Sequence, residues 1–325
     1  MRCPKCGDDQ KQKHGSLCSC GYQFIFQGAS SQGMTDIKFL GILRRASQNG
    51  HFYFTFAQLY TAWCQQDAED HLALFQKKLF VVSIVLFVFS VACILLFGWL
   101  SAVFSVVSLI IPYLLFRQYR QRQLPELGQL KKLVKQWQTG RGGEDEMLLL
   151  NPGLHEVAAA FPVKEFIGYG VERIIIVERR LLVDLLVRNA FHADQNALIF
   201  SRDGYPASIV HYAQNVLKEN KLLPIYLLHD ASENGMLMQQ KVKLSGRKVI
   251  DLGVKPEHIE KMKFLSALQL EKKKHRAPLD ILPYPVLATL CGQAFQEENS
   301  FSEVLEQWDA SRKQKSFFKK INREQ

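Results

Sequence analysis

The chain has 325 residues, which leaves room for a core domain of ordinary size together with smaller modules, and we expect three units. Its 41 lysine and arginine residues exceed its 31 aspartate and glutamate residues, and the resulting formal net charge of +10 favours an anionic partner, either nucleic acid or the inner lipid surface. Four of the seven cysteines lie within the first 20 residues, a pattern that favours a metal site in a reducing cytoplasm over disulfides, which are the alternative.

Residues 1–24 predict a small zinc ribbon. Cys3 and Cys6 form a C-x2-C pair, and Cys18 and Cys20 form a C-x-C pair. Four thiolates in two close pairs can surround a tetrahedral zinc ion, and a glycine after each pair supplies a tight turn. The pattern resembles the short zinc ribbons that open many bacterial membrane and regulatory proteins, although its second knuckle is one residue tighter than usual. Zinc would supply most of the folding free energy, because so small a unit has almost no hydrophobic core.

Residues 33–78 follow a Gly- and Ser-rich linker and predict a small helical module. Thr35 is expected to cap a helix that carries Ile37, Leu40 and Leu43 on one face. An Asn-Gly-His sequence then ends this helix. The module lacks a basic recognition face, so a structural role is favoured over helix-turn-helix DNA binding.

Residues 79–116 form an apolar run without a charged side chain and predict a transmembrane hairpin of two membrane helices. One crossing takes about 20 apolar residues, so a run of nearly twice that length fits two crossings. Gly98, Trp99 and Ser101 near its middle suit a turn at the interface. A buried hairpin in a soluble core is the disfavoured alternative, because neither half of the run has a polar face.

Basic residues flank the apolar run on both sides. Lys77 and Lys78 precede it, and several arginines follow it. By the positive-inside rule, this arrangement predicts a multi-pass protein of the bacterial inner (cell) membrane with both termini in the cytoplasm. Membrane lipid is therefore one expected partner.

The second half of the chain predicts an α/β domain at 144–310, after a basic juxtamembrane helix and linker at 117–143. Short apolar strands are expected at 173–178, 197–201 and 223–230, with helices between them. Continuous apolar strands that alternate with helices indicate a parallel sheet covered on both faces. The basic tail at 311–325 could bind anionic lipid or nucleic acid, although most such tails are only solvated.

Two acidic residues end strands of this predicted sheet. Glu178 closes the first strand and Asp230 closes the third. Ligands of open α/β sheets gather at the carboxyl ends of the strands, so a metal-binding acidic cluster would form there. For either residue alone, a helix N-cap is the favoured alternative.

Four stretches share their order and spacing with a known family. They are IIIVE at 174–178, RDGYP at 202–206, LPIYLLHDAS at 223–232 with Gly235, and VIDLGVKPEHI at 249–259. Together they resemble the Toprim domain, most closely that of the A subunit of type IIB topoisomerases, of its meiotic double-strand-break relatives and of the nuclease subunit of plasmid-defence condensin systems. The resemblance covers roughly the last half of the chain. It implies that Glu178 is a metal ligand or general acid/base and that Asp230 is the first aspartate of an Asp-x-Asp motif that holds magnesium.

The sequence departs from the family pattern in three respects. Ser232 stands where the family has its second aspartate, which should weaken magnesium binding, and Glu233 beside it points elsewhere in an extended turn. Arg179 stands where relatives often carry lysine and keeps the positive charge. No separate domain carries a nucleophilic tyrosine, so strand passage is not expected. The absence of HExxH, GxSxG and P-loop motifs also leaves metalloprotease and ATPase functions without support.

The sequence therefore predicts a multidomain α/β protein with a transmembrane α-hairpin: a small four-cysteine zinc ribbon, two membrane helices and a C-terminal Toprim-like parallel-sheet α/β domain. Its expected function is membrane-tethered engagement of nucleic acid on the cytoplasmic face, as a magnesium-dependent nuclease or a weakened nuclease or sensor in a bacterial antiviral defence or DNA-processing system. Partner proteins and an oligomer are compatible with that role. The alternative is a non-enzymatic membrane scaffold that recruits proteins through the ribbon and a degenerate Toprim fold. Ser232 favours the scaffold, whereas Glu178 and the positive charge favour nucleic acid.

Overall fold

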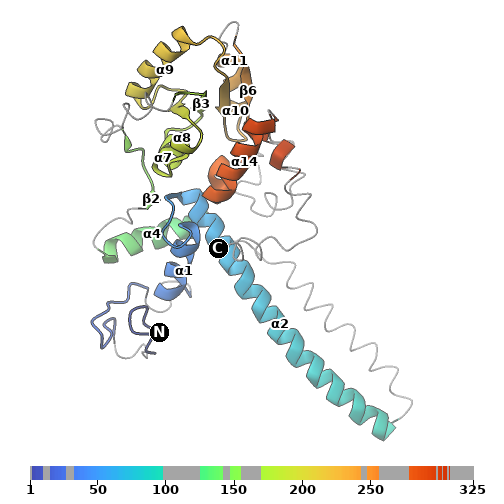
Figure 1. The fold of residues 1–325 in the computed structure, drawn as a ribbon. Coiled ribbons are helices and arrows are strands. Elements are labelled where there is room, and N and C mark those ends of the chain that lie inside the picture. The colour runs from blue at the N-terminus through green and yellow to red at the C-terminus, as the bar shows by residue number, and fades with distance from the viewer. Residues whose placement is uncertain are drawn as a thin grey trace. The chain divides into compact units, whose positions relative to one another are not determined.

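The structure is a computed structural model of the whole chain. It describes residues 2–9, 15–26, 33–97, 125–141, 147–154, 170–242, 247–255, 278–297, 299–301, 303–305 and 307. Two compact units are present, one formed by Met1–Thr61 with Lys132–Gln325 and the other by Ala62–Lys131. Figure 1 labels most of the helices and strands. Their bounds are α1 Asp36–Ala46, β1 Phe54–Thr55, α2 Phe56–Phe97, α4 Leu127–Arg141, β2 Leu148–Leu149, β3 Arg173–Val177, α7 Arg180–Arg188, α8 Phe191–Asp194, β4 Ala197–Ser201, α9 Ala207–Glu219, β5 Ile225–Leu228, α10 Glu233–Met236, α11 Met238–Lys241, β6 Val249–Asp251, the 3-10 helix η4 Leu279–Ile281 and α14 Tyr284–Glu297.

The larger unit contains a four-stranded parallel sheet in the order β4-β3-β5-β6. The central strand β3 pairs Ile174 with Leu198 of β4 on one side and with Ile225 of β5 on the other. Residues 174–177 of this strand are all buried, which is the burial pattern of a strand covered on both faces. The α/β domain with a parallel sheet that the sequence predicts is therefore confirmed.

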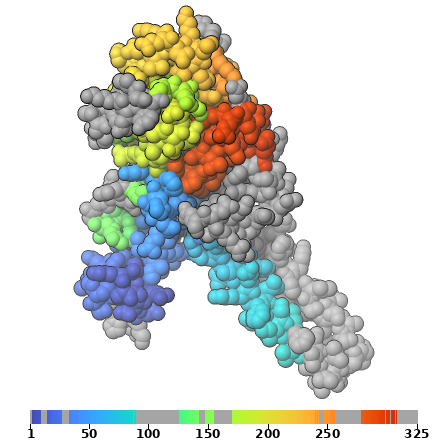
Figure 2. Space-filling model, viewed as in Figure 1, coloured from blue at the N-terminus to red at the C-terminus, as the bar shows by residue number. Residues whose placement is uncertain are grey.

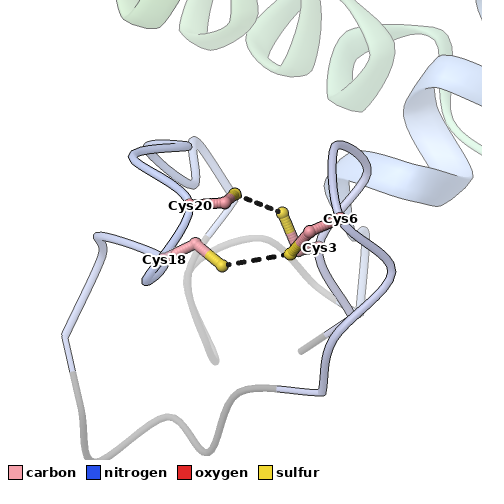
Figure 3. Close-up of side chains that lie close together, drawn as sticks. All are labelled: Cys3, Cys6, Cys18 and Cys20. Carbon is pink, nitrogen blue, oxygen red and sulfur yellow. Dashed lines mark hydrogen bonds between the residues drawn. The ribbon is translucent and has the colours of Figure 1, made fainter.

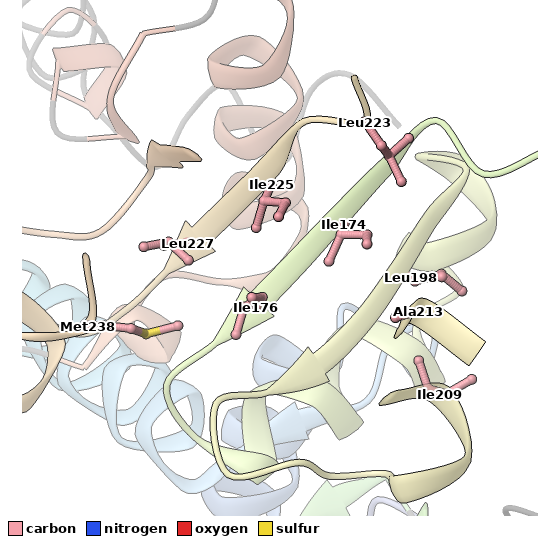
Figure 4. Packing of buried hydrophobic residues seen from close by; sticks show 9 residues of the cluster. All are labelled: Ile174, Ile176, Leu198, Ile209, Ala213, Leu223, Ile225, Leu227 and Met238. Atoms are coloured by element: carbon pink, nitrogen blue, oxygen red, sulfur yellow. The ribbon is translucent and has the colours of Figure 1, made fainter. Parts of the chain in front are cut away.

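Helices cover both faces of the sheet. On one face, α9 and α11 pack over the aliphatic side chains of β3, β4 and β5 (Figure 4). The buried members of this cluster are Ile174, Ile176, Leu198, Ile209, Ala213, Leu223, Ile225, Leu227 and Met238. On the other face, the Phe295 ring of α14 lies 4.6 Å from the Tyr226 ring of β5 and 6.2 Å from the Phe191 ring of α8, measured between centroids.

A second, two-stranded parallel sheet pairs Phe54 and Thr55 of β1 with Leu148 and Leu149 of β2. A capping box then begins α2, because Thr55 N donates to Gln58 Oε1 at 2.9 Å and Gln58 N donates to Thr55 Oγ1 at 3.4 Å.

The first turns of α2 also hold the segment around η4. Gln58 Nε2 donates to the Leu282 carbonyl at 2.8 Å, and Thr61 Oγ1 donates to the Ile281 carbonyl at 2.9 Å. Both contacts are buried, so they fix the position of the Asp280 segment.

The predicted transmembrane hairpin at 79–116 is wrong. Among the residues that the structure describes, no helix combines the length and the apolar character that a membrane crossing requires. Residues 79–97 do not start a helix of their own but continue α2 from Phe56, and the earlier turns of that helix carry acidic residues at Asp67, Glu69 and Asp70. The prediction treated the apolar run as a separate helix, although residues 79–97 belong to a longer helix whose earlier turns are polar. The multi-pass inner-membrane localisation that depended on the hairpin is corrected with it.

Several expected features lie outside the described residues. They are the turn at Gly98, Trp99 and Ser101, the arginines after the apolar run, the linker glycines Gly142 and Gly143, and the basic tail.

Candidate metal centre and carboxylate network

Two matching turns bring the four predicted zinc ligands together. The Cys3 carbonyl accepts a hydrogen bond from Gly7 N at 3.0 Å, and the Cys18 carbonyl accepts one from Gly21 N at 2.9 Å. The two glycines have φ angles of 81° and 82°, a region that favours glycine because it has no Cβ. An isolated antiparallel bridge closes the chain around each turn.

The four sulfur atoms lie within 4.8 Å of one another (Figure 3). The Sγ atoms of Cys3 and Cys20 are 3.5 Å apart, and those of Cys6 and Cys18 are 3.6 Å apart. A disulfide has an S–S length of about 2.05 Å, so none joins them. Zn–S bonds of about 2.3 Å in a tetrahedron place the sulfurs about 3.8 Å apart. The donor set and its spacing are compatible with a zinc site.

The pKa values of Cys3 and Cys6 are shifted in opposite directions. Desolvation opposes ionisation of Cys3, but the backbone N–H groups of Cys6 and Lys5 and the neighbouring thiols lower its pKa to about 6. The N–H of Asp8 lowers the pKa of Cys6, yet desolvation and the thiols of Cys20, Cys3 and Cys18 raise it to about 12. One thiolate is thus stabilised at the expense of its neighbours, as happens when acidic groups share a small volume. A bound cation would remove this competition.

Asp36 fastens the end of the ribbon to α1. Its Oδ2 accepts hydrogen bonds from Tyr22 Oη at 2.8 Å and from Ile25 N at 3.0 Å, and its Oδ1 accepts one from Phe26 N at 2.9 Å. The Phe26 ring also stacks on the Trp137 ring of α4 with their centroids 5.8 Å apart. The end of the ribbon is therefore packed against α1 and against the part of α4 that belongs to the larger unit.

The sheet brings together the two acidic residues that the sequence singled out. Glu178 follows β3 and Asp230 follows β5, and these strands are neighbours. Glu178 Oε2 accepts from Asp230 N at 2.9 Å, and Glu178 Oε1 accepts from Ser232 Oγ at 2.9 Å. Ser232 Oγ in turn accepts from Gly235 N at 2.9 Å and caps α10. Protein donors thus hold both oxygens of the Glu178 carboxylate.

Arg179 neutralises the other carboxylates at this edge of the sheet. Its guanidinium donates to both oxygens of Asp230, at 2.5 and 3.1 Å, and to Oδ1 of Asp280 at 2.5 Å. Asp230 Oδ1 also accepts from Leu279 N at 2.8 Å. Burial lowers the pKa of Arg179, but the charges of Asp280 and Asp230 outweigh it and raise the pKa above its ordinary value. Both oxygens of Asp230 are therefore bound by a charged group of the protein itself.

His229 is fully buried behind Asp230. Its Nδ1 lies 2.8 Å from the Asp230 carbonyl, and its Nε2 lies 2.9 Å from Asp251 Oδ1, outside good hydrogen-bond alignment. Burial lowers the pKa of His229, but Asp251 and the Asp230 carbonyl raise it more. Gly235 and Gly253 enclose the ring so closely that a Cβ would lie 2.6 Å and 1.9 Å from its nitrogens. The ring is therefore closely packed, with its Nε2 beside the Asp251 carboxylate.

Magnesium finds no support at this edge of the sheet. Within the described part of the chain, the four cysteines are the one group of three or more His, Cys, Asp or Glu residues whose ligand atoms lie close enough to share a metal ion. The oxygens of Glu178 and Asp230 face N–H and O–H donors of the protein. The sequence located these two residues side by side but missed Asp280, because its stretch has no periodic or strand-end pattern. Asp251 could have been found, since it ends the strand in VID.

No protein-family model, no curated protein and no solved structure matches this chain.

Proposed function

We propose that this protein is a non-catalytic binding protein, in which a zinc-stabilised ribbon and a Toprim-like α/β domain recruit partners. The four cysteines would hold one structural zinc ion, for which their number, type and spacing are suited. The juxtaposition of Glu178 and Asp230 on neighbouring parallel strands supports the Toprim-like assignment.

One observation carries the non-catalytic role. In a magnesium-dependent nuclease the carboxylates hold the ion that neutralises the phosphodiester. Here Arg179 bridges Asp230 and Asp280, and its side chain supplies the positive charge between them. A divalent cation at Asp230 would have to displace an internal, partly buried guanidinium. Of the two functions that the sequence predicts, the geometry therefore favours the scaffold over the nuclease.

The nuclease remains the second candidate because Glu178 and Asp230 do meet at the edge of the sheet. The test uses the zinc-loaded full-length protein with labelled single-stranded and double-stranded DNA and RNA, in the presence of magnesium or manganese. We expect no cleavage above that of the Glu178→Gln variant. Metal-dependent cleavage that the wild-type protein shows and the Glu178→Gln variant lacks would overturn the proposal. The paired variant also removes the ambiguity of a contaminating nuclease, which would act equally in both samples.

A further inference from the structure

An open groove runs between the end of the ribbon and helix α4. Its volume is about 550 Å³, and its wall on the ribbon side is formed by Gln23, Phe24 and Ile25. The remaining lining residues come from α4 and are Lys132, Lys135, Gln136, Thr139 and Gly140. Ribbon and α4 lie next to each other in the space-filling view, in dark blue and green (Figure 2).

The walls of this groove are held at a fixed distance. Gln136 Nε2 donates across the junction to the Ile25 carbonyl at 3.1 Å. Gly140 lets Ile25 approach the helix, since a Cβ at this position would lie 2.8 Å from Ile25 Cγ1. On the far side, Asp36 binds Ile25 N at 3.0 Å. The groove is therefore a built feature of the packed ribbon.

The charged side chains among the described lining residues of the groove are both positive. Lys132 and Lys135 are exposed and are three residues apart on α4, which places them on the same face of the helix. No acidic residue is among the described residues that line the groove. Among the described residues, neither lysine forms an ion pair. Two neighbouring ammonium groups, with no carboxylate among the described lining residues, favour an anion with more than one charge.

We infer that this groove binds the phosphodiester backbone of a nucleic acid. Lys132 and Lys135 would contact successive phosphates, and the net charge of +10 would add a long-range attraction. An acidic peptide is the weaker candidate, because peptide sites depend on pockets for apolar anchors and Phe24, the aromatic residue of the groove, is only 3 % exposed. The inference rests on the non-catalytic role proposed above and gives it a ligand.

The experiment compares two charge-matched double variants of the zinc-loaded full-length protein. Lys132→Glu with Lys135→Glu reverses the charge of the groove. Lys218→Glu with Lys221→Glu makes the same change, at the same spacing in the sequence, on two exposed lysines of the α/β domain, one in the last turn of α9 and one just after its end. The probes are fluorescent oligothymidylate and oligouridylate of about 20 nucleotides, a length that exceeds common single-strand site sizes.

We expect the groove variant to lose at least about tenfold in affinity for the oligonucleotides, and the slope of log K against log salt to flatten by about 1.4 for two lost phosphate contacts. The control variant should stay within about twofold of wild type, as a loss of nonspecific attraction alone would give. Equal losses of affinity in both double variants would show that the groove is not the binding site. If polyglutamate or inorganic phosphate binds at the groove and neither oligonucleotide does, the proposal that the ligand is a nucleic acid is wrong.

This outcome is separable from that of the nuclease test. If the oligonucleotides are cleaved but the groove variant binds them normally, both proposals fail. If nothing is cleaved and the groove variant binds normally, the groove proposal alone fails.

Discussion

The thiol cluster of the ribbon and the carboxylate network of the α/β domain solve the same electrostatic problem in opposite ways. Each gathers acidic side chains into a small volume, where like charges destabilise one another. In the carboxylate network, Arg179 supplies an internal cation to Asp230 and Asp280. In the thiol cluster, the described contacts of Cys3 and Cys6 are to other thiols and to the backbone.

The difference shows how acidic residues can be sorted into metal sites and structural sites. A cluster that lacks a counter-charge has a use for a metal ion, whereas a cluster with a well-placed guanidinium is already neutralised. The residue types alone did not show that the carboxylate network is a structural site, because carboxylates at the ends of parallel strands are also the ligands that magnesium prefers. The contacts of the neighbouring arginine separate them.

The largest effect is expected at the thiol cluster. Cys3→Ser and Cys18→Ser each remove one of four ligands, so the purified protein should fall from one zinc per chain to essentially none. The ribbon should unfold in these variants while the α/β domain stays folded, because metal binding and ribbon folding are coupled. Metal analysis and heteronuclear NMR spectra would measure the two effects. Ser19→Ala, next to Cys18, is the control and should keep its zinc. Full zinc content in both cysteine variants would show that the site is misassigned.

The next effect concerns the internal cation. Arg179→Leu leaves Asp230 and Asp280 buried without a counter-charge, and breaking a buried pair in this way costs about 3–5 kcal/mol. Arg180→Leu is the matched control, because its ion pair with Asp203 is about half exposed and such pairs are worth at most about 1 kcal/mol. Urea unfolding of the three proteins would compare their stabilities. Equal losses of unfolding free energy in the two variants would show that Arg179 does not act as an internal counter-charge for Asp230 and Asp280.

A smaller effect is expected from His229 and depends on pH. Because Asp251 and the Asp230 carbonyl raise the pKa of His229 in the folded protein above the ordinary value of 6.5, the protonated ring stabilises the fold below that pH. This stabilisation is lost as the pH rises through the folded-state pKa, and its size is about 1.4 kcal/mol for each unit by which the pKa is raised.

The measurement is urea unfolding of wild type and His229→Asn at about pH 6 and about pH 9. Asp251 has a lowered pKa and stays ionised across this range, so it does not contribute to the slope. Wild-type stability should fall more steeply than that of the variant. Parallel losses in the two proteins would contradict the charged state of His229.

Much of the fold could be predicted from short-range patterns. The strand expected at 197–201 coincides with β4, and the strand expected at 173–178 differs from β3 by one residue, because continuous apolar runs in a parallel sheet have clear ends. Thr35 caps α1 as expected and accepts from Lys38 N at 3.2 Å. What failed was the hairpin, where apolar content was considered without the polar turns that precede it in α2.

The candidate site was only partly predictable for a different reason. Glu178 and Asp230 could be paired because strand ends in one sheet lie together. Asp280 is 50 residues from Asp230 in the sequence, and both carboxylates accept from Arg179. Asp280 lies in η4, whose position depends on buried contacts with Gln58 and Thr61 at the start of α2. No local pattern encodes such a contact, and without it the role of Arg179 could not be inferred.

The smallest effect is expected from variants of Ser232, which test whether Ser232 or Arg179 prevents magnesium from binding at Glu178 and Asp230. Ser232→Ala removes a helix cap and a hydrogen bond to Glu178, at a cost of about 0.5–2 kcal/mol. Ser232→Asp keeps an acceptor for Gly235 N but places a carboxylate against Glu178 Oε1, so it should also be less stable than wild type.

If the missing aspartate alone prevented metal binding, magnesium would restore the stability of Ser232→Asp. We expect no such rescue, since Arg179 still holds both oxygens of Asp230. Rescue should require the double variant Arg179→Leu with Ser232→Asp, whose thermal midpoint should rise with magnesium. A magnesium-dependent rise in the single Ser232→Asp variant equal to that in the double variant would show that Arg179 yields to the ion, and the two clusters would then differ less than their contacts indicate.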